Sequence, residues 1–172
     1  MTTTRRSFLR TAPLAAATLA LADAAAQPAA QPVAQPAAPV AFHLFPAAEL
    51  SDAARALLLK GGNHNLIDAA PGLPCSLVLT TELAKSAKEF EWHDQRDHIL
   101  LILDGSTVYE LGGTPVTPRL TKPGEHLAPE STGATRITLS KGDLLTIPRG
   151  TPHRRLTAAS VTFYLFSPSG TI

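Results

Sequence analysis

The pattern of apolar and polar positions changes near Cys75. Ahead of it, apolar residues recur at helical spacing, which predicts one helix from about Pro46 to Lys60 that ends at Gly61. After it, short apolar or β-branched runs alternate with turn residues. These runs predict strands over 76–83, 89–93, 98–103, 107–111, 135–139, 143–147 and 161–166. Short strands at this spacing are typical of an all-β sandwich or barrel, with the helix packed outside a sheet.

Two segments carry side chains that can bind a metal ion. The first, residues 91–98, reads Glu-Trp-His-Asp-Gln-Arg-Asp-His. In a strand, Glu91 and His93 face the same way, and the polar residues that follow predict a tight turn that returns His98 beside His93 in a hairpin. The alternative buries the aromatic neighbours and leaves Glu91 and His93 in water. In the second segment, residues 142–153, a Gly-Pro-Gly framework places His153 at a fixed point.

These two segments resemble the motifs of the cupin superfamily. The second cupin motif is a Gly, five residues, Pro-x-Gly, two residues and a His, and it is matched by Gly142, Pro148, Gly150 and His153. Thr157 stands in place of its closing Asn. The first motif is matched in part, by His93 and the closing Gly105, whereas the family's Gly, first His and Glu are replaced by Lys85, Glu91 and His98. The resemblance covers roughly residues 75–167. It implies a small double-stranded β-helix, or jelly-roll, barrel.

The resemblance also implies a metal centre formed by His93, His98, His153 and Glu91. Three imidazoles and one carboxylate suit divalent Fe, Mn, Ni, Co or Zn, and the sequence does not choose among these metals. An octahedral ion with four protein ligands would keep positions for a substrate or dioxygen. The alternative is a metal-free barrel whose histidines only form hydrogen bonds.

The N-terminal residues indicate export. Residues 4–10, Thr-Arg-Arg-Ser-Phe-Leu-Arg, precede an Ala/Leu-rich run and a small-residue cleavage site, which is typical of a twin-arginine signal peptide over residues 1–26. The apolar run is too short for a permanent membrane span. Residues 27–41 repeat Gln-Pro without charge and predict a disordered spacer, which leaves 42–172 as the barrel domain. We therefore expect recognition by the twin-arginine export machinery and a periplasmic or secreted protein.

Composition and patterning also bear on partners. The net charge is +1, and no basic run or aromatic platform indicates nucleic-acid binding. The single cysteine excludes an internal disulfide. The predicted strand 98–103 is apolar on both faces, and such strands are usually covered on both sides. The outer cover is either the N-terminal helix or a second subunit, and we expect a homodimer with sheet-to-sheet contact. Residues 114–132 are rich in proline, contain His126 and predict a long loop.

Three functions from different classes are open at this stage. The first is a metal-dependent oxidoreductase of the dioxygenase type, acting on a small organic substrate, in which His98 or Glu91 accepts a proton. The second is a non-catalytic periplasmic module that binds a small molecule or a metal. The third is a metal-assisted isomerase or epimerase, which uses a base near the metal and no dioxygen. Barrels of this kind host unrelated activities, so the fold does not decide among the three.

Overall fold

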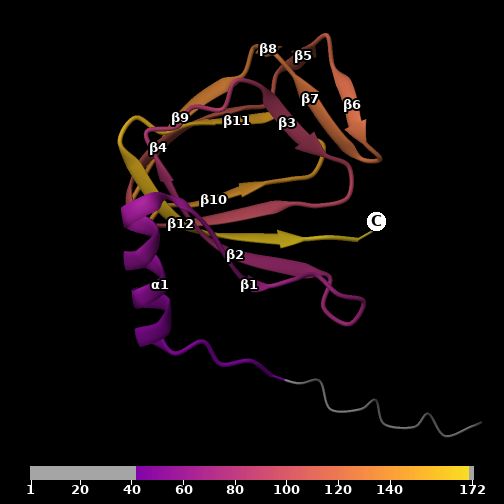
Figure 1. Ribbon diagram of the computed structural model, residues 1–172. Helices are drawn as coiled ribbons and strands as arrows, with labels where there is room; N and C mark the ends of the chain where they lie inside the picture. The colour runs from indigo at the N-terminus through magenta and orange to yellow at the C-terminus, as the bar shows by residue number, and fades with distance from the viewer. Residues whose placement is uncertain (1–41, 171–172) are drawn as a thin grey trace, which may run out of the picture. The chain divides into compact units, whose positions relative to one another are not determined.

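A computed structural model describes residues 42–170 (Figure 1). The predicted signal peptide, residues 1–26, and the predicted spacer, residues 27–41, lie outside the described residues. One helix precedes a series of strands, most of them short. In this part of the chain, no helix is long and apolar enough to cross a membrane.

The helix α1 (Ala47–Lys60) closely follows the predicted bounds. It ends at Gly61, where a φ of 68° lets the backbone N–H donate to the Leu57 carbonyl. The helix packs against β1 (Gly62–Ile67) and β2 (Cys75–Leu83), with Leu57 buried. The strand β1 was not predicted because its first residues are polar and typical of turns.

The strands form two sheets that share one long strand, β4 (His98–Leu111). The first sheet contains, in spatial order, β1, β2, β12 (Ser160–Pro168), the first half of β4 and β10 (Leu144–Ile147). The second contains β9 (Thr135–Ser140), the second half of β4, β11 (His153–Leu156), β3 (Phe90–His93), β7 (Glu125–Ala128) and β6 (Arg119–Lys122). All these pairings are antiparallel. Two sheets joined in this way form a small jelly-roll barrel, which confirms the predicted fold class.

The strand β4 passes from one sheet to the other near Gly105. The sequence pattern predicts two strands here, 98–103 and 107–111, but both belong to one continuous strand. Gly105 has a φ of 73°, and a Cβ at this position would lie 2.2 Å from the carbonyl oxygen of Ser160 in β12. Both the backbone conformation and the close approach require glycine.

The prediction of a long loop over residues 114–132 is wrong. The strands β6 and β7 extend the second sheet, and β5 (Thr114–Val116) pairs with β8 (Glu130–Thr132) in a small separate sheet. Because β7 pairs with β3, this segment forms part of the wall beside His93. The prolines of this segment led to the prediction of a loop, because proline is rare inside strands. It is tolerated at sheet edges, however, and Pro115 lies within β5.

The barrel interior contains an apolar cluster and a group of buried polar side chains. The apolar cluster draws on β4, β9, β10 and β12 and consists of Leu100, Ile102, Tyr109, Leu139, Ile147, Val161 and Phe163. The buried polar group includes three of the predicted metal ligands, His93, His98 and His153. Burial of polar groups costs free energy unless they are paired, so the partners of these histidines decide what the site can do.

Candidate metal centre

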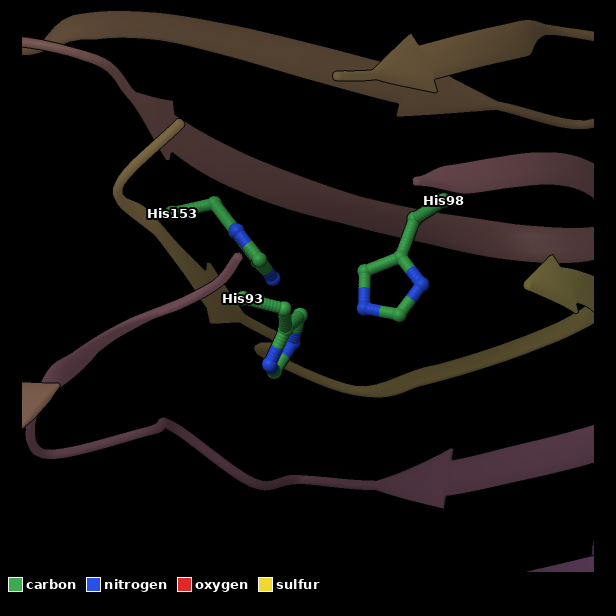
Figure 2. A group of neighbouring side chains, drawn as sticks. All are labelled: His93, His98 and His153. Carbon is green, nitrogen blue, oxygen red and sulfur yellow. The ribbon is translucent and has the colours of Figure 1, made fainter. Parts of the chain in front are cut away.

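Three buried histidines from three strands converge inside the barrel. His93 ends β3, His98 begins β4 and His153 begins β11. Their exposed fractions are 4%, 8% and 5% respectively. One ring nitrogen from each lies within 4.8 Å of the others, and Figure 2 shows the three rings facing a common point. The structure thus brings together the three histidines that the sequence analysis assigned to one site.

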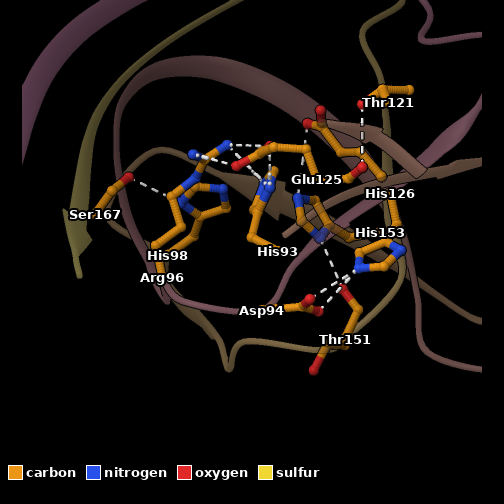
Figure 3. A network of polar contacts seen from close by, with 11 residues as sticks. His93, Asp94, Arg96, His98, Thr121, Glu125, His126, Thr151, His153 and Ser167 are labelled. Atoms are coloured by element: carbon orange, nitrogen blue, oxygen red, sulfur yellow. Dashed lines mark hydrogen bonds and ion pairs between the residues drawn. The ribbon is translucent and has the colours of Figure 1, made fainter. Parts of the chain in front are cut away.

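In each histidine, Nδ1 has a hydrogen-bond partner outside the cluster (Figure 3). The partners are the Thr151 carbonyl for His153 at 2.9 Å, Glu125 Oε2 for His93 at 2.8 Å and the Ser167 hydroxyl for His98 at 2.9 Å. A backbone carbonyl can only accept, so His153 carries its proton on Nδ1, whereas His93 Nδ1 lies between an acceptor, Glu125, and a donor, Arg96 at 2.9 Å. A neutral imidazole protonated on Nδ1 has its lone pair on Nε2. Nε2 is therefore the nitrogen that His153 offers to a metal ion.

Burial favours the neutral form of all three imidazoles. It lowers the pKa of His98 from 6.5 to about 3, and His153, His93 and nearby arginines act in the same direction. Burial also lowers the pKa of His93 and of His153, although Glu91 opposes the shift in both. Because a metal binds the neutral ring, protons do not compete for these nitrogens at neutral pH.

The predicted hairpin between His93 and His98 is wrong. Since β3 lies in the second sheet and the first half of β4 in the first, residues 94–97 cross between the sheets. The Asp97 carboxylate fixes this crossing by accepting hydrogen bonds from the backbone N–H and the guanidinium of Arg149. The N–H of Gly150 donates to the His93 carbonyl at 2.8 Å. The histidines thus meet across the barrel, held by the same proline-glycine turn that precedes His153.

Glu91, the fourth predicted ligand, lies at the margin of the centre. It stands opposite His153 in the pairing of β3 with β11. Its side chain is 55% exposed, and its Oε1 lies 3.7 Å from His153 Nε2. The structure therefore places Glu91 beside His153 but outside the buried group of three.

Two residues at the centre, Glu125 and Arg96, were not predicted. Arg96 donates to both oxygens of Glu125, at 2.8 and 2.9 Å, and its guanidinium lies 2.9 Å from His93 Nδ1. Glu125 is opposite His93 in the pairing of β7 with β3. Residues 123–129, Pro-Gly-Glu-His-Leu-Ala-Pro, show no alternation of polar and apolar residues, so the sequence carries no strand signal at Glu125.

His126, the neighbour of Glu125, lies outside the centre. Its ring stacks on Trp92 with the ring centroids 5.0 Å apart, and its Nε2 lies 3.0 Å from the Asp94 carboxylate. Alternation along β3 and β7 puts Trp92 and His126 on the face opposite His93 and Glu125. His126 therefore has structural partners of its own.

A cavity of about 350 Å³ adjoins the centre, and its wall includes His98, His153 and Glu91. Arg155 forms another part of the wall together with Glu82 and Tyr109. Two N–H groups of Arg155 donate to Glu82 at 2.7 Å, and a third donates to the Tyr109 hydroxyl at 2.9 Å. A cavity of this volume suits one small organic molecule.

No family model and no curated protein matches the chain. Solved structures with a similar fold include a cupin superfamily protein from Desulfitobacterium hafniense, with 15% identity and a TM-score of 0.45 over 64% of this chain and 79% of that chain. A cupin-2 domain protein from Rhodospirillum rubrum has 17% identity and a TM-score of 0.44, over 64% of this chain and 60% of that chain. A Klebsiella pneumoniae protein with a double-stranded β-helix domain has 11% identity and a TM-score of 0.45, over 64% and 78%.

Proposed function

We propose that this chain is a cupin-type domain that binds a divalent first-row metal through His93, His98 and His153. The observation that carries the proposal is the arrangement of the three imidazoles. Each is buried, each Nδ1 has its own partner, and one nitrogen from each lies within 4.8 Å of the others. Nitrogen donors of this kind suit Fe, Mn, Ni, Co or Zn.

Glu91 is the proposed fourth ligand. Its carboxylate lies 3.7 Å from His153 Nε2, on the cavity side of the centre. A carboxylate would reduce the net charge that a divalent ion brings into a site of neutral imidazoles. Glu91 is also the group best placed to accept a proton from a ligand in the cavity, because it is partly exposed there.

Elemental analysis of the chain purified without added metal tests the proposal. We expect about one divalent transition metal per chain, and almost none in the His93→Ala/His153→Ala double variant, because tight binding needs the complete donor set. The His43→Ala/His64→Ala double variant is the matched control, since both of these histidines are exposed. Equal metal content in the two double variants would rule the centre out.

For the reaction, we propose an oxidoreductase of the dioxygenase type acting on a small organic substrate. When bound, a redox-active metal such as Fe(II) would supply coordination positions for substrate and dioxygen. The chain's own residues would hold the substrate in the cavity, exclude bulk water and, at Glu91, accept a proton.

Dioxygen uptake separates this reaction from the other candidates. Iron-reconstituted protein is supplied with phenolic and diketone substrates, and uptake that depends on His93 and His153 supports the dioxygenase. Stabilisation by ligands without turnover would instead support a binding module. Substrate conversion without dioxygen consumption would support an isomerase or epimerase, for which the base would be Glu91.

We also propose that the protein is exported through the twin-arginine route and acts in the periplasm or outside the cell as a homodimer. Export is supported by the paired arginines and the small-residue cleavage site in residues 1–26. The dimer is supported by half-buried apolar residues on the outer face of the first sheet, among them Leu101 of β4 and Tyr164 of β12.

A further inference from the structure

The charged groups around the cavity beside the histidines are mostly paired with one another or with close neighbours. Arg155 pairs with Glu82, Arg154 with Glu110 and Arg119 with Glu89. Two cations of the cavity wall, Lys85 and Lys88, have no ion-pair partner among residues 42–170, and one wall carboxylate, Glu91, has only His153 beside it. The two lysines lie on the exposed segment between β2 and β3.

Backbone hydrogen bonds fix this lysine-bearing segment to the barrel. The Lys85 carbonyl accepts from the N–H of Thr157 at 2.7 Å, and the N–H of Ala87 donates to the Arg155 carbonyl at 2.9 Å. The two ammonium groups are thus carried by a backbone that is tied to β11, the strand that also supplies His153. Fixed cations at the mouth of a concave site attract anions and raise their local concentration.

Deeper in the wall, Tyr109 presents a hydrogen-bond donor. Its hydroxyl oxygen accepts from Arg155, which Glu82 holds in place with two further hydrogen bonds. Burial raises the pKa of Tyr109, so the phenol keeps its proton. That proton has no acceptor among the described residues, and a buried donor gains most from a partner when water is scarce.

We propose that the ligand of this cavity is a small organic carboxylate, drawn in by Lys85 and Lys88 and bound through a hydrogen bond from the Tyr109 hydroxyl. The proposal deepens the proposed function and rests on it for the metal-side contact. Tyr109 is thereby a specificity-determining residue. An uncharged amide of the same shape gains nothing from the lysines, so the charge of the ligand is what the site distinguishes.

Calorimetric titration tests the inference with succinate and benzoate and with the amides succinamide and benzamide, on metal-loaded and metal-free protein. We expect the carboxylates to bind at least about tenfold more tightly than the amides. Added salt should lower the affinity for the carboxylates, because it screens the charge of the lysines. The Lys85→Gln/Lys88→Gln variant should lose about tenfold in carboxylate affinity, and Lys122→Gln/Lys141→Gln, which changes exposed lysines elsewhere, should lose none.

The Tyr109→Phe variant removes only the hydroxyl and should weaken the carboxylates by about tenfold. Tyr164→Phe, on the outer face of β12, is its control and should leave their affinity unchanged. Equal affinity for acids and amides, no binding of either carboxylate at millimolar concentration, or full affinity in both the Tyr109 and lysine variants would overturn the inference. Metal content is measured on the same samples. Lysine-dependent carboxylate binding without any metal uptake would overturn the proposed function and leave this inference standing.

Discussion

At the scale of single residues, the hydrogen bond at Nδ1 decides what each histidine can do. The partner of His153 Nδ1 is a carbonyl, a pure acceptor, so this ring has one tautomer with its lone pair on Nε2, whereas His93 Nδ1 is shared by Glu125 and Arg96. The Glu125 carboxylate also makes the His93 imidazole a stronger donor to a metal. Arg96 donates two hydrogen bonds to Glu125, which fix the position of this carboxylate beside His93.

Glu125→Gln is predicted to weaken metal binding by about tenfold, because a neutral amide supports the His93 ring less strongly than a carboxylate. The dissociation constant is measured by competition with a chromophoric chelator. Glu130→Gln, at an exposed position of β8, is the control. Unchanged affinity in Glu125→Gln would show that this carboxylate only braces Arg96.

The stability of the metal-free protein should fall as the pH drops below about 6.5. The folded pKa of His98 is about 3 against an ordinary value of 6.5. Between these values the unfolded chain binds a proton at this position that the folded chain does not, so the contribution of neutral His98 is present above pH 6.5 and is lost as the pH falls towards 3.

Urea denaturation at about pH 7 and about pH 5 measures this effect above the titration range of most carboxylates. His98→Gln removes the titrating ring, so its midpoint should fall less between the two pH values than that of the wild type. His64→Gln, at an exposed position of β1, should behave like the wild type. An equal fall in all three proteins would assign the pH dependence to other groups.

The site could be predicted in part because the histidine motif is local in the sequence. His153 follows a turn whose glycine and proline are recognisable by type, and His93 occupies the predicted strand. Glu125 and Arg96 could not be predicted, because their contact depends on pairing between β3 and β7, and nothing in a single sequence gives that register. Glu91 was predicted as a ligand from its place in the cupin-like motif and from alternation with His93, neither of which shows that its side chain is 55% exposed.

At the scale of elements, the long strand β4 determines how the barrel is built. Its first half joins the first sheet and brings in His98, whereas its second half joins the second sheet and brings in Tyr109. The transition is made at Gly105, where the backbone of β12 is so close that no side chain would fit. A bend within a strand lets one element serve both layers of a barrel.

Gly105→Ala is predicted to destabilise the protein by about 3 kcal/mol, since a Cβ would overlap the Ser160 carbonyl and the residue has a positive φ. Gly112→Ala is a close control: its φ is 72°, against 73° at Gly105, and a Cβ there would have nothing within 4 Å. It should cost only about 1 kcal/mol from backbone strain. Equal costs in urea denaturation would mean that the strand crossing relaxes without penalty.

Most elements could be predicted because their apolar runs are long enough to show a period. The helix α1 and the strands β2, β3, β9, β10 and β12 lie close to the predicted ranges. Residues 114–132 were missed because short strands with proline do not show an apolar period. Their order comes from pairing with β3 and with one another.

At the scale of the whole molecule, the division into two sheets explains why the predicted barrel is correct although the predicted hairpin between β3 and β4 is wrong. Adjacent strands separated by a polar turn usually pair, and β3 and β4 were expected to do so. In a jelly roll, consecutive strands often belong to opposite sheets, as these two do. The separation is what lets His93 and His98 approach from opposite walls and meet His153 between them.

The outer face of the first sheet supports the proposed homodimer. Leu100 and Ile102 are in the buried core, so Ile99 and Leu101 point outward by strand alternation. Tyr164 lies opposite Leu101 in the pairing of β12 with β4, and its ring centroid is 6.3 Å from that of Phe166. The helix α1 packs on β1 and β2, which leaves this apolar stripe without cover from the helix. The residues of the stripe are half-buried within one chain, and a second subunit would cover the apolar surface that they still expose.

Light scattering at micromolar concentration should therefore give the mass of two chains for the mature domain. Leu101→Lys places a charge in the middle of the stripe, and burying an unpaired charge in a dimer interface is costly, so this variant should be monomeric. Leu120→Lys in β6, a position that is 61% exposed, is the control and should remain dimeric. Circular dichroism checks that both variants stay folded. If the wild-type mass is that of one chain, the stripe is solvent-exposed surface and the centre must function within a single barrel.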